Sequence, residues 1–371
     1  MKIAFITRNY PPTICGIGDH TFHLAKEMKR QNHEIHIVCG ADQNKDFNDE
    51  NTHPIVSKWD FKGVQEVANL LKTLQIDWVI VQYEAYGYNK KGFPYPFFYL
   101  YFLLNKSNIP ILTVFHEIMI RKEGNFKKTV LSILMTTLAK TLCHLSNKVV
   151  TSIDFYAQIL NQNVDKLSII PVGSNILPTK ITPDEQAQLR EKYNIPNDAP
   201  VIVTFGQRDI SVYLKTFDLL KKTFPKLIWL VCGKTATPLS ILDNCGYIRH
   251  TGKMSAEDIH RHLSLGNVFF MPDYVSETGE GGSCNKSGTL ACAFLLGIPI
   301  VGTKGDMNNA LLKDGENILL TDLNLPDALF QNLMTCLSSP QFADNLSQNA
   351  KETYQKSLKW DVIAQQFLAL I

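Results

Sequence analysis

Short apolar runs alternate with amphipathic stretches from the first residues of the chain onward. An apolar run at 2–7 is followed by a turn-rich loop, a stretch of helical spacing at 20–31 and a second apolar run at 34–39. Runs this short and this apolar are typical of strands buried on both faces, and a helix between two of them connects parallel strands. The pattern predicts a strand–loop–helix–strand unit at the start of the chain.

The same alternation continues to residue 303, with one polar interruption near 182–198. The further predicted strands are 77–82, 110–115, 148–152, 200–205, 227–232, 267–272 and 298–303, with helical stretches such as 127–145 between them. Strands that alternate with helices form a parallel sheet covered on both faces. We therefore predict an α/β protein of two doubly wound, Rossmann-like domains, 1–180 and 181–357. They would face each other across a cleft at the carboxyl ends of their strands, where such sheets bind ligands.

Composition supports a folded protein and excludes two classes. The 371 residues are 45% hydrophobic and 19% charged, with a net formal charge of +2. These values exclude disorder as the main state, and they exclude a nucleic-acid binder driven by phosphate contacts. Residues 1–180 hold 20 basic against 15 acidic residues, which suits an anionic acceptor, a membrane surface or an ordinary solvated surface. The eight cysteines include no Cys-x-x-Cys pair, so we expect buried, reduced thiols.

The sequence gives two indications of location. Polar residues and two prolines soon interrupt the first apolar run, which does not fit a secretory signal. The longest uncharged aromatic run, 93–104, is shorter than the ~20 residues that cross a bilayer. It is either a core helix or an exposed patch that touches lipid, and the same alternatives hold for a basic cluster at Arg121, Lys122, Lys127 and Lys128. We expect a cytoplasmic protein, with peripheral contact at the inner face of the membrane as the open alternative.

A glycine-containing loop follows the first predicted strand. Gly16 and Gly18 lie where a helix begins, so their N–H groups could face an anion with the helix dipole behind them. A dinucleotide fingerprint would require a third glycine at position 21, where Thr21 stands, and an acidic residue at the end of the second strand, where Cys39 stands. The loop therefore does not indicate a nicotinamide or flavin dehydrogenase.

The second domain contains two candidate phosphate-binding segments. Arg208 follows a strand and Lys215 begins the next helix, so the pair could grip a diphosphate; both could equally be ordinary surface cations. Residues 276–290 are rich in glycine and hydroxyl side chains at a helix start and could form a phosphate cradle or a flexible loop with an N-cap. The cradle candidates are Gly281, Gly282, Ser283 and Thr289. The segment lacks the order of a Walker loop and does not indicate an NTPase.

Polar residues also end two predicted strands of the first domain. His116 ends the strand 110–115 and is a candidate donor or acid/base toward a sugar hydroxyl, with a structural histidine as the alternative. Tyr83 and Glu84 end the strand 77–82 and are candidates to line an acceptor pocket. The sequence contains no G-x-S-x-G, no H-E-x-x-H and no Cys/His metal spacing, so we expect no metal site.

The ordered set of segments resembles the family 4 glycosyltransferases, retaining enzymes of GT-B architecture, through nearly the whole chain. The segments are YPPTICGIGDHTFHLAKEMKRQNHEIHIVC, VQYE, TVFHE, VVTSIDFYAQIL, IIPVGSNI, TFGQRD with LKTFDLL, LVCG, HTGKMSAEDIHRHLSLGNVFFMPD, GIPIVGT and LKWDVIAQQFLAL. The resemblance implies a nucleotide-sugar donor on the second domain and a polysaccharide, glycolipid or similar acceptor on the first. It also implies that a final helix, 358–371, crosses back to the first domain.

The resemblance assigns roles to the candidate residues. Gly16 and Gly18 would face the donor phosphate or the acceptor, and His116 would lie beside the transferred sugar. Arg208 and Lys215 would neutralise the leaving nucleoside diphosphate. Fixed cations and helix-start N–H groups can stabilise that charge without a cofactor, so we expect none.

The chain departs from the family at its pair of glutamates. Family members usually have two Glu residues eight positions apart, the second of which binds the ribose. Ungapped counting from the GIPIVGT segment places Cys284 and Cys292 at these positions, and a short gap would bring Glu280 to the first one, facing the transferred sugar. Two alternatives to a glycosyltransferase therefore stay open: a sugar-nucleotide epimerase on the same architecture, and a non-catalytic GT-B protein with a binding or regulatory role.

Overall fold

The computed structural model describes residues 1–42, 50–121, 125–160, 165–325 and 327–371. It divides into two compact units: unit 1 comprises Met1–Pro171 with Trp360–Ile371, and unit 2 comprises Val172–Lys359. Residues 172–180, predicted to belong to the first domain, lie in unit 2 because the Val172 amide donates to the carbonyl oxygen of Asn285 (2.9 Å) and Ser174 is buried there.

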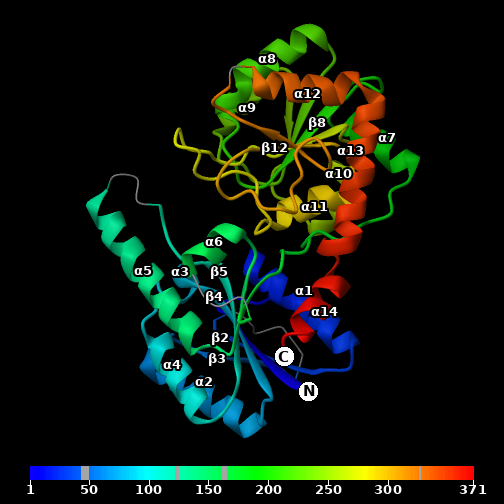
Figure 1. Ribbon diagram of the computed structural model, residues 1–371. Helices are drawn as coiled ribbons and strands as arrows, with labels where there is room; N and C mark the ends of the chain where they lie inside the picture. The colour runs from blue at the N-terminus through cyan, green and yellow to red at the C-terminus, as the bar shows by residue number, and fades with distance from the viewer. Residues whose placement is uncertain (43–49, 122–124, 161–164, 326) are drawn as a thin grey trace. The chain divides into compact units, whose positions relative to one another are not determined.

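Unit 1 is built on a seven-stranded sheet in the order β3-β2-β1-β4-β5-β6-β7, with every pair parallel. Helices lie on both faces (Figure 1). The strands are β1 (Lys2–Ile6), β2 (Glu34–Gly40), β3 (Thr52–Val56), β4 (Trp78–Glu84), β5 (Ile111–Glu117), β6 (Lys148–Thr151) and β7 (Leu167–Ile169). The helices are α1 (Gly16–Arg30), α2 (Phe61–Leu74), α3 (Ala85–Tyr88), α4 (Pro96–Lys106), α5 (Phe126–Leu145), α6 (Asp154–Leu160) and α14 (Trp360–Leu368).

The last helix of the chain belongs to the core of unit 1. Ile363, Ala364 and Phe367 of α14 are buried with Ile3, Phe5 and the apolar side chains of α1 in one cluster. The helix starts at Trp360, two residues after the predicted bound of 358, because a π-helical turn at Tyr354–Leu358 (η2) continues α13. Burial of this face holds the C-terminal segment on the sheet.

Unit 2 repeats the plan with six parallel strands in the order β10-β9-β8-β11-β12-β13. Along β8 the side chains alternate: Val201 and Val203 pack on one face of the sheet and Ile202 on the other. The strands are β8 (Val201–Phe205), β9 (Ile228–Cys232), β10 (Ile248–His250), β11 (Val268–Phe270), β12 (Ile300–Thr303) and β13 (Leu319–Thr321). The helices are α7 (Pro183–Lys192), η1 (Ser211–Tyr213), α8 (Leu214–Thr223), α9 (Leu239–Asp243), α10 (Ala256–Leu263), α11 (Gly288–Leu296), α12 (Ala328–Ser338) and α13 (Pro340–Thr353).

Each sheet has one switch point, where the strand order reverses. In unit 1 it lies between β1 and β4, and in unit 2 between β8 and β11. Loops leave such a pair of strands toward opposite faces, so the carboxyl ends border a crevice that commonly binds ligands. Apart from His116, the predicted site residues end or follow one of these four strands.

Candidate functional site

The switch point of unit 2 is organised by an ion pair. Arg208 follows β8, and its Nε and Nη2 lie 2.9 and 2.8 Å from Oδ1 of Asp273, which follows β11. Arg208 Nη1 also donates to the carbonyl oxygen of Phe205 (2.6 Å). The three contacts fix the plane of the guanidinium, and two of its five N–H groups are left for another acceptor.

Gly206 and Thr289 complete this edge of unit 2. Gly206 has φ +101°, and a Cβ built on it would lie 2.3 Å from Arg208 Nη1 and 3.4 Å from the Thr289 hydroxyl oxygen. The positive φ and the close approach to Arg208 both favour glycine at this position. Thr289 lies in the first turn of α11, whose N-cap Ser287 makes no side-chain capping bond. The first N–H groups of a helix have no intrahelical acceptor, so the start of α11 and the remaining Arg208 donors can act on one anion.

Backbone donors of the glycine segment form hydrogen bonds within the protein. The amide of Gly281 donates to Asp306 Oδ1 (2.7 Å), that of Gly282 to the Tyr274 carbonyl (3.0 Å), and that of Ser283 to the Thr303 carbonyl (3.0 Å). The Ser283 hydroxyl donates to Asp273 Oδ2 (3.0 Å) and accepts from the Thr303 amide (3.0 Å). The backbone donors of Gly281, Gly282 and Ser283 are thus already used within the protein, and their binding to the donor stays a prediction.

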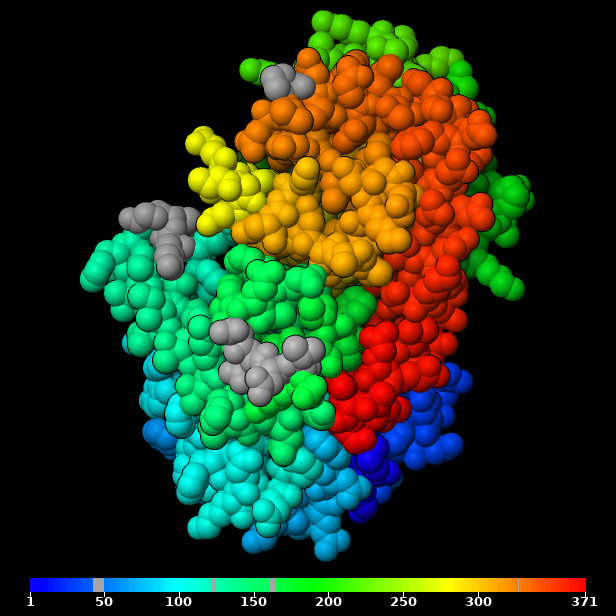
Figure 2. Space-filling view, in the orientation of Figure 1, coloured from blue at the N-terminus to red at the C-terminus, as the bar shows by residue number. Residues whose placement is uncertain are grey.

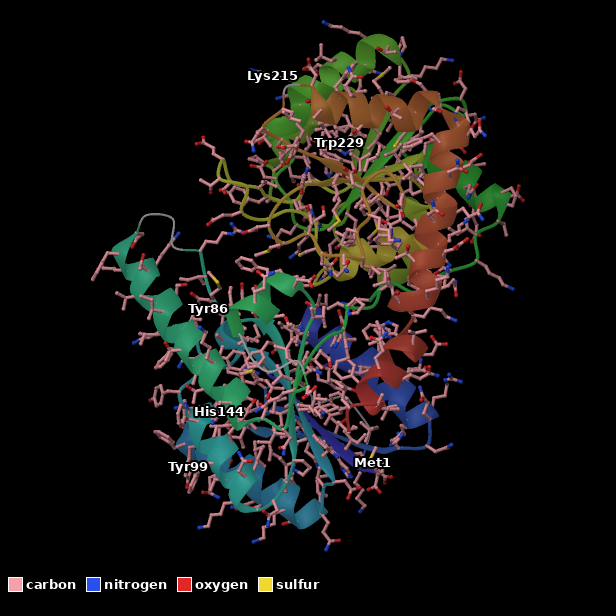
Figure 3. The ribbon with its side chains drawn as sticks, in the orientation of Figure 1. Met1, Tyr86, Tyr99, His144, Lys215 and Trp229 are labelled. Carbon is pink, nitrogen blue, oxygen red and sulfur yellow. The ribbon has the colours of Figure 1, made fainter. Side chains whose placement is uncertain are left out.

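Two further predictions for unit 2 stay predictions. Lys215 is exposed in the first turn of α8 and forms no hydrogen bond or ion pair with any residue that the structure describes (Figure 3). Glu280 is exposed at the end of a short hairpin in which the Ser276 amide donates to the Glu280 carbonyl (2.9 Å). The positions of Lys215 and Glu280 neither support nor contradict a diphosphate-binding or catalytic role.

The two cysteines at the family's glutamate positions are core residues. Cys284 and Cys292 are both buried, and burial raises the pKa of the Cys284 thiol to about 11 and that of Cys292 to about 12. Both stay neutral thiols at physiological pH, and α11 contains no Asp or Glu. The helix therefore offers no carboxylate for a ribose.

At the switch point of unit 1, His116 is held by Gln82. His116 Nε2 lies 2.6 Å from Gln82 Oε1, and the His116 ring meets the buried ring of His20 edge to face at 5.2 Å between centroids. Both nitrogens of His20 lack a hydrogen-bond partner among the described residues. Burial, followed by the proximity of His116 and His23, lowers the pKa of His20 well below its ordinary value. His20 is therefore a neutral, buried side chain that packs against the ring of His116.

Three carboxyl groups of unit 1, those of Glu84, Glu117 and Asp19, lie at the same edge of the sheet. Glu84 is half-buried and is in register with Glu117 of β5; burial, and then the charge of Glu117, raise the pKa of Glu84. Asp19, in the first turn of α1, has a pKa raised to about 6 by burial. Sequence reasoning named Glu84 but missed Asp19, Gln82 and Asp273; Asp273 directly follows an apolar strand, so the rule that selected Glu84 would also have found it.

Two predicted residues of unit 1 have a different environment from the one expected. Tyr83 is 0% exposed and packs edge to face on Phe115, in the core on the opposite side of β4 from Gln82. It cannot line an acceptor pocket, and that prediction is wrong. Gly18 is buried in α1, where a Cβ would lie 2.9 Å from the Asn9 carbonyl oxygen, so it permits close packing. Gly16 is exposed at the start of α1, and its role stays a prediction.

The described ranges contain neither a cluster of metal ligands nor a helix that could span a membrane. Within them, no three His, Cys, Asp or Glu side chains come together as metal ligands, and the absence of a metal or other cofactor stays a prediction. None of the helices in those ranges combines the length and apolar character needed to cross a bilayer. Lys122 of the basic cluster lies outside the described residues.

Two parallel, doubly wound sheets, each with polar side chains at its switch point, form the GT-B fold. The model of Glycosyltransferase Family 4 matches residues 14–176, and that of Glycosyl transferases group 1 matches residues 185–353. The chain belongs to the family 4 glycosyltransferases, which confirms the resemblance, and it is a glycosyltransferase.

Similar proteins match the chain over nearly its whole length. The alpha-monoglucosyldiacylglycerol synthase of Acholeplasma laidlawii is 20% identical, over 96% of this chain and 95% of its own. The crystal structure of Anabaena Alr3699/HepE in complex with UDP and glucose has a TM-score of 0.70 and 15% identity, covering 100% of this chain and 98% of that one. The UDP-GlcNAc 2-epimerase of Neisseria meningitidis, bound to UDP-GlcNAc, has a TM-score of 0.61 and 11% identity over 100% and 99%. Because transferases and an epimerase share this fold, the reaction has to be argued from the site.

Proposed function

We propose that this glycosyltransferase moves a sugar, with retention of anomeric configuration, from a nucleoside-diphosphate sugar to a polysaccharide or glycolipid acceptor. The observation that carries the donor proposal is the Arg208–Asp273 pair at the switch point of unit 2, beside Gly206 and the start of α11. Departure of a nucleoside diphosphate builds negative charge on its oxygens, and preorganised donors in a partly dry site stabilise that charge. The complexes of Alr3699/HepE with UDP and glucose support the same ligand class.

Lys215 is the second cation of this proposal. Its ammonium group has no partner among the described residues and sits on the helix that follows Arg208. A cation that meets charge mainly in the transition state raises the rate of transfer. With Arg208, Lys215 and helix N–H groups available, no metal is needed, and excess EDTA should leave turnover unchanged.

The test is transfer of labelled sugar from a panel of nucleotide sugars, with and without candidate acceptors. We expect Lys215→Ala to lower kcat/KM at least about tenfold, the effect of ~1.4 kcal/mol of lost stabilisation. Lys222→Ala, which removes an exposed lysine at the other end of α8, is the matched control and should be neutral. Unchanged transfer by Lys215→Ala would refute the diphosphate role. Product that forms without acceptor and differs only in sugar configuration would indicate an epimerase instead.

Peripheral membrane contact forms part of the proposal, and α5 carries it. Phe126, Val130, Ile133 and Leu134 are exposed by 40–81% and recur with the spacing of one helix face. Lys127 lies exposed at the same end of the helix as Phe126. Figure 2 shows the α5 segment, in teal, on the outer surface of unit 1. Apolar side chains next to cations suit an anionic lipid surface, and the Acholeplasma laidlawii relative is named for a lipid product.

Vesicle flotation tests this contact. The protein should float with vesicles of phosphatidylglycerol and phosphatidylcholine, and the double change Phe126→Ser with Ile133→Ser should reduce the bound fraction several-fold. Val212→Ser alters an equally exposed apolar residue in unit 2 and should have no effect. Equal flotation of the double variant and the unmodified protein would exclude α5 as the membrane-binding element.

A further inference from the structure

Unit 1 contains a pocket of about 530 Å³ that none of the predicted residues lines. Its walls come from the segments that follow β1, β3 and β4: Arg8 follows β1, Lys58 and Trp59 follow β3, and Tyr86 lies in α3 directly after β4. Strands β1 and β4 flank the switch point of this sheet. The pocket therefore occupies the place where a doubly wound sheet commonly binds a ligand.

Aromatic side chains form one wall of the pocket. Trp59 is 8% exposed and is wedged against Tyr88 (4.7 Å between ring centroids) and Phe97 (5.8 Å). Tyr86 and Tyr95 also line the pocket and are more exposed. Gly92 has φ +75°, and a Cβ on it would lie 2.8 Å from Cζ of Tyr86, so the glycine allows the tyrosine ring to lie against the loop. Flat, fixed rings of this kind suit the apolar faces of a sugar ring.

The indole N–H of Trp59 is an unsatisfied donor. Trp59 Nε1 is buried and has no hydrogen-bond acceptor among the described residues. A buried donor without an acceptor costs about 1–3 kcal/mol, and a buried indole normally finds a partner. The Trp59 ring itself lines the pocket, so the indole N–H signal would report a ligand that packs against the ring.

Positive charge predominates on the described wall. Lys58 and Lys90 form no ion pair with any described residue, and Arg8 binds Asp42 through two contacts of 2.8 Å. The carboxylate of the wall, Asp60, accepts from the Gly63 amide (3.0 Å) as the N-cap of α2. The two lysines are thus available to a bound anion, and little negative charge opposes them.

From these observations we propose that the pocket binds an anionic saccharide, a sugar ring that carries a carboxylate or a phosphate. The sugar ring would pack on the aromatic wall, and Lys58 and Lys90 would bind the anion. That the bound saccharide is part of the sugar acceptor rests on the proposed transfer function; the binding itself does not.

Binding can be followed at the indole N–H signals of the four tryptophans in ¹H–¹⁵N spectra, with Trp59→Phe to assign the Trp59 signal. The probes are glucuronic acid, glucose 6-phosphate, glucose and inorganic phosphate, each added without nucleotide. We expect the Trp59 signal to move with both acidic sugars at concentrations at least about tenfold below those needed for glucose. A carboxylate or phosphate preference between the two identifies the anion.

Charge variants provide the control. Lys58→Gln with Lys90→Gln should weaken binding of the acidic sugars at least about tenfold, whereas Lys140→Gln, an exposed lysine of α5, should not change it. Equal shifts with glucose would overturn the anionic part of the proposal, equal shifts with inorganic phosphate would overturn the saccharide part, and no shift with any probe would overturn both. Because Lys215→Ala should leave these titrations unchanged, failure here and failure of the donor proposal can be told apart.

Discussion

The two switch points have the same topology but differ in how their central polar side chains are paired. In unit 2, Arg208, Asp273, Ser283 and Thr303 contact one another through bonds of 2.8–3.1 Å. In unit 1, the described groups at the equivalent edge include polar atoms without partners: both nitrogens of His20, Nε2 of Gln82 and Nε1 of Trp59.

The two switch points therefore differ in how firmly hydrogen bonds fix their polar groups. A network that is already satisfied holds its remaining donors in a fixed geometry, which favours stabilisation of charge that develops during a reaction. Buried groups without partners are costly, and they leave the edge of unit 1 less firmly fixed by hydrogen bonds than that of unit 2. Unit 2 is thus the better preorganised of the two switch points.

Disruption of the Arg208 network should have the largest effect. Arg208→Ala removes both the fork to Asp273 and the donors left for a diphosphate, so we expect kcat/KM for transfer to fall about a hundredfold, or ~2.7 kcal/mol. Arg208→Lys keeps the charge without the fork and should recover less than a tenth of the lost activity. Full activity of the lysine variant, with an unchanged melting temperature, would show that the satisfied network has no catalytic importance.

The packing of the glycine segment should have the next largest effect. Gly282 has φ +93°, and a Cβ on it would lie 2.7 Å from the Gly305 nitrogen; Gly279 has φ +82° with open space around it. Gly282→Ala therefore combines strain with a backbone clash and should lower the free energy of unfolding of unit 2 by ~2–3 kcal/mol, against ~1 kcal/mol for Gly279→Ala. Urea unfolding of the two variants measures the difference. Equal losses would mean that the segment yields and is not a packed support.

The sequence predicted the central strands of both sheets but not their edge strands. The nine strands predicted from apolar runs all exist, whereas β3, β7, β10 and β13 were not predicted, and these are the outermost strands of the two sheets. A central strand is buried on both faces and needs a continuous apolar run, but an edge strand such as Ile248–His250 has only three residues and polar side chains.

The sequence predicted which strand ends carry the site residues, but it did not predict which residues form hydrogen bonds with them. His116 and Arg208 were correctly located at carboxyl ends of strands, yet their partners Gln82 and Asp273 were not identified, because a hydrogen bond between strands depends on register. Tyr83 shows the same limit: adjacent residues of a strand point to opposite faces, and the apolar run 77–82 does not say which face is the site. The pocket at Trp59 is formed by three segments that are distant in sequence, so no sequence motif predicts it.

The smallest effect is expected from Asp19, a carboxyl group of unit 1 that contrasts with the paired Asp273. Burial raises the pKa of Asp19 to about 6, from an ordinary value of 3.8. Native protein therefore binds more protons than unfolded protein between pH 4 and 6, and its stability falls as pH rises through that window. Asp19→Asn has no carboxyl group to ionise, so its stability should lack this fall. The free energy of unfolding of Asp19→Asn should match that of the unmodified protein near pH 4 and exceed it by ~1 kcal/mol at pH 7, a figure reduced for the water that still reaches the side chain.

Urea unfolding at both pH values measures this difference, with Asp344→Asn, at an exposed position of α13, as the control. A variant no more stable than the unmodified protein at pH 7 would mean that Asp19 has found a partner in solution, and the contrast between the two switch points would then be weaker than the structure indicates.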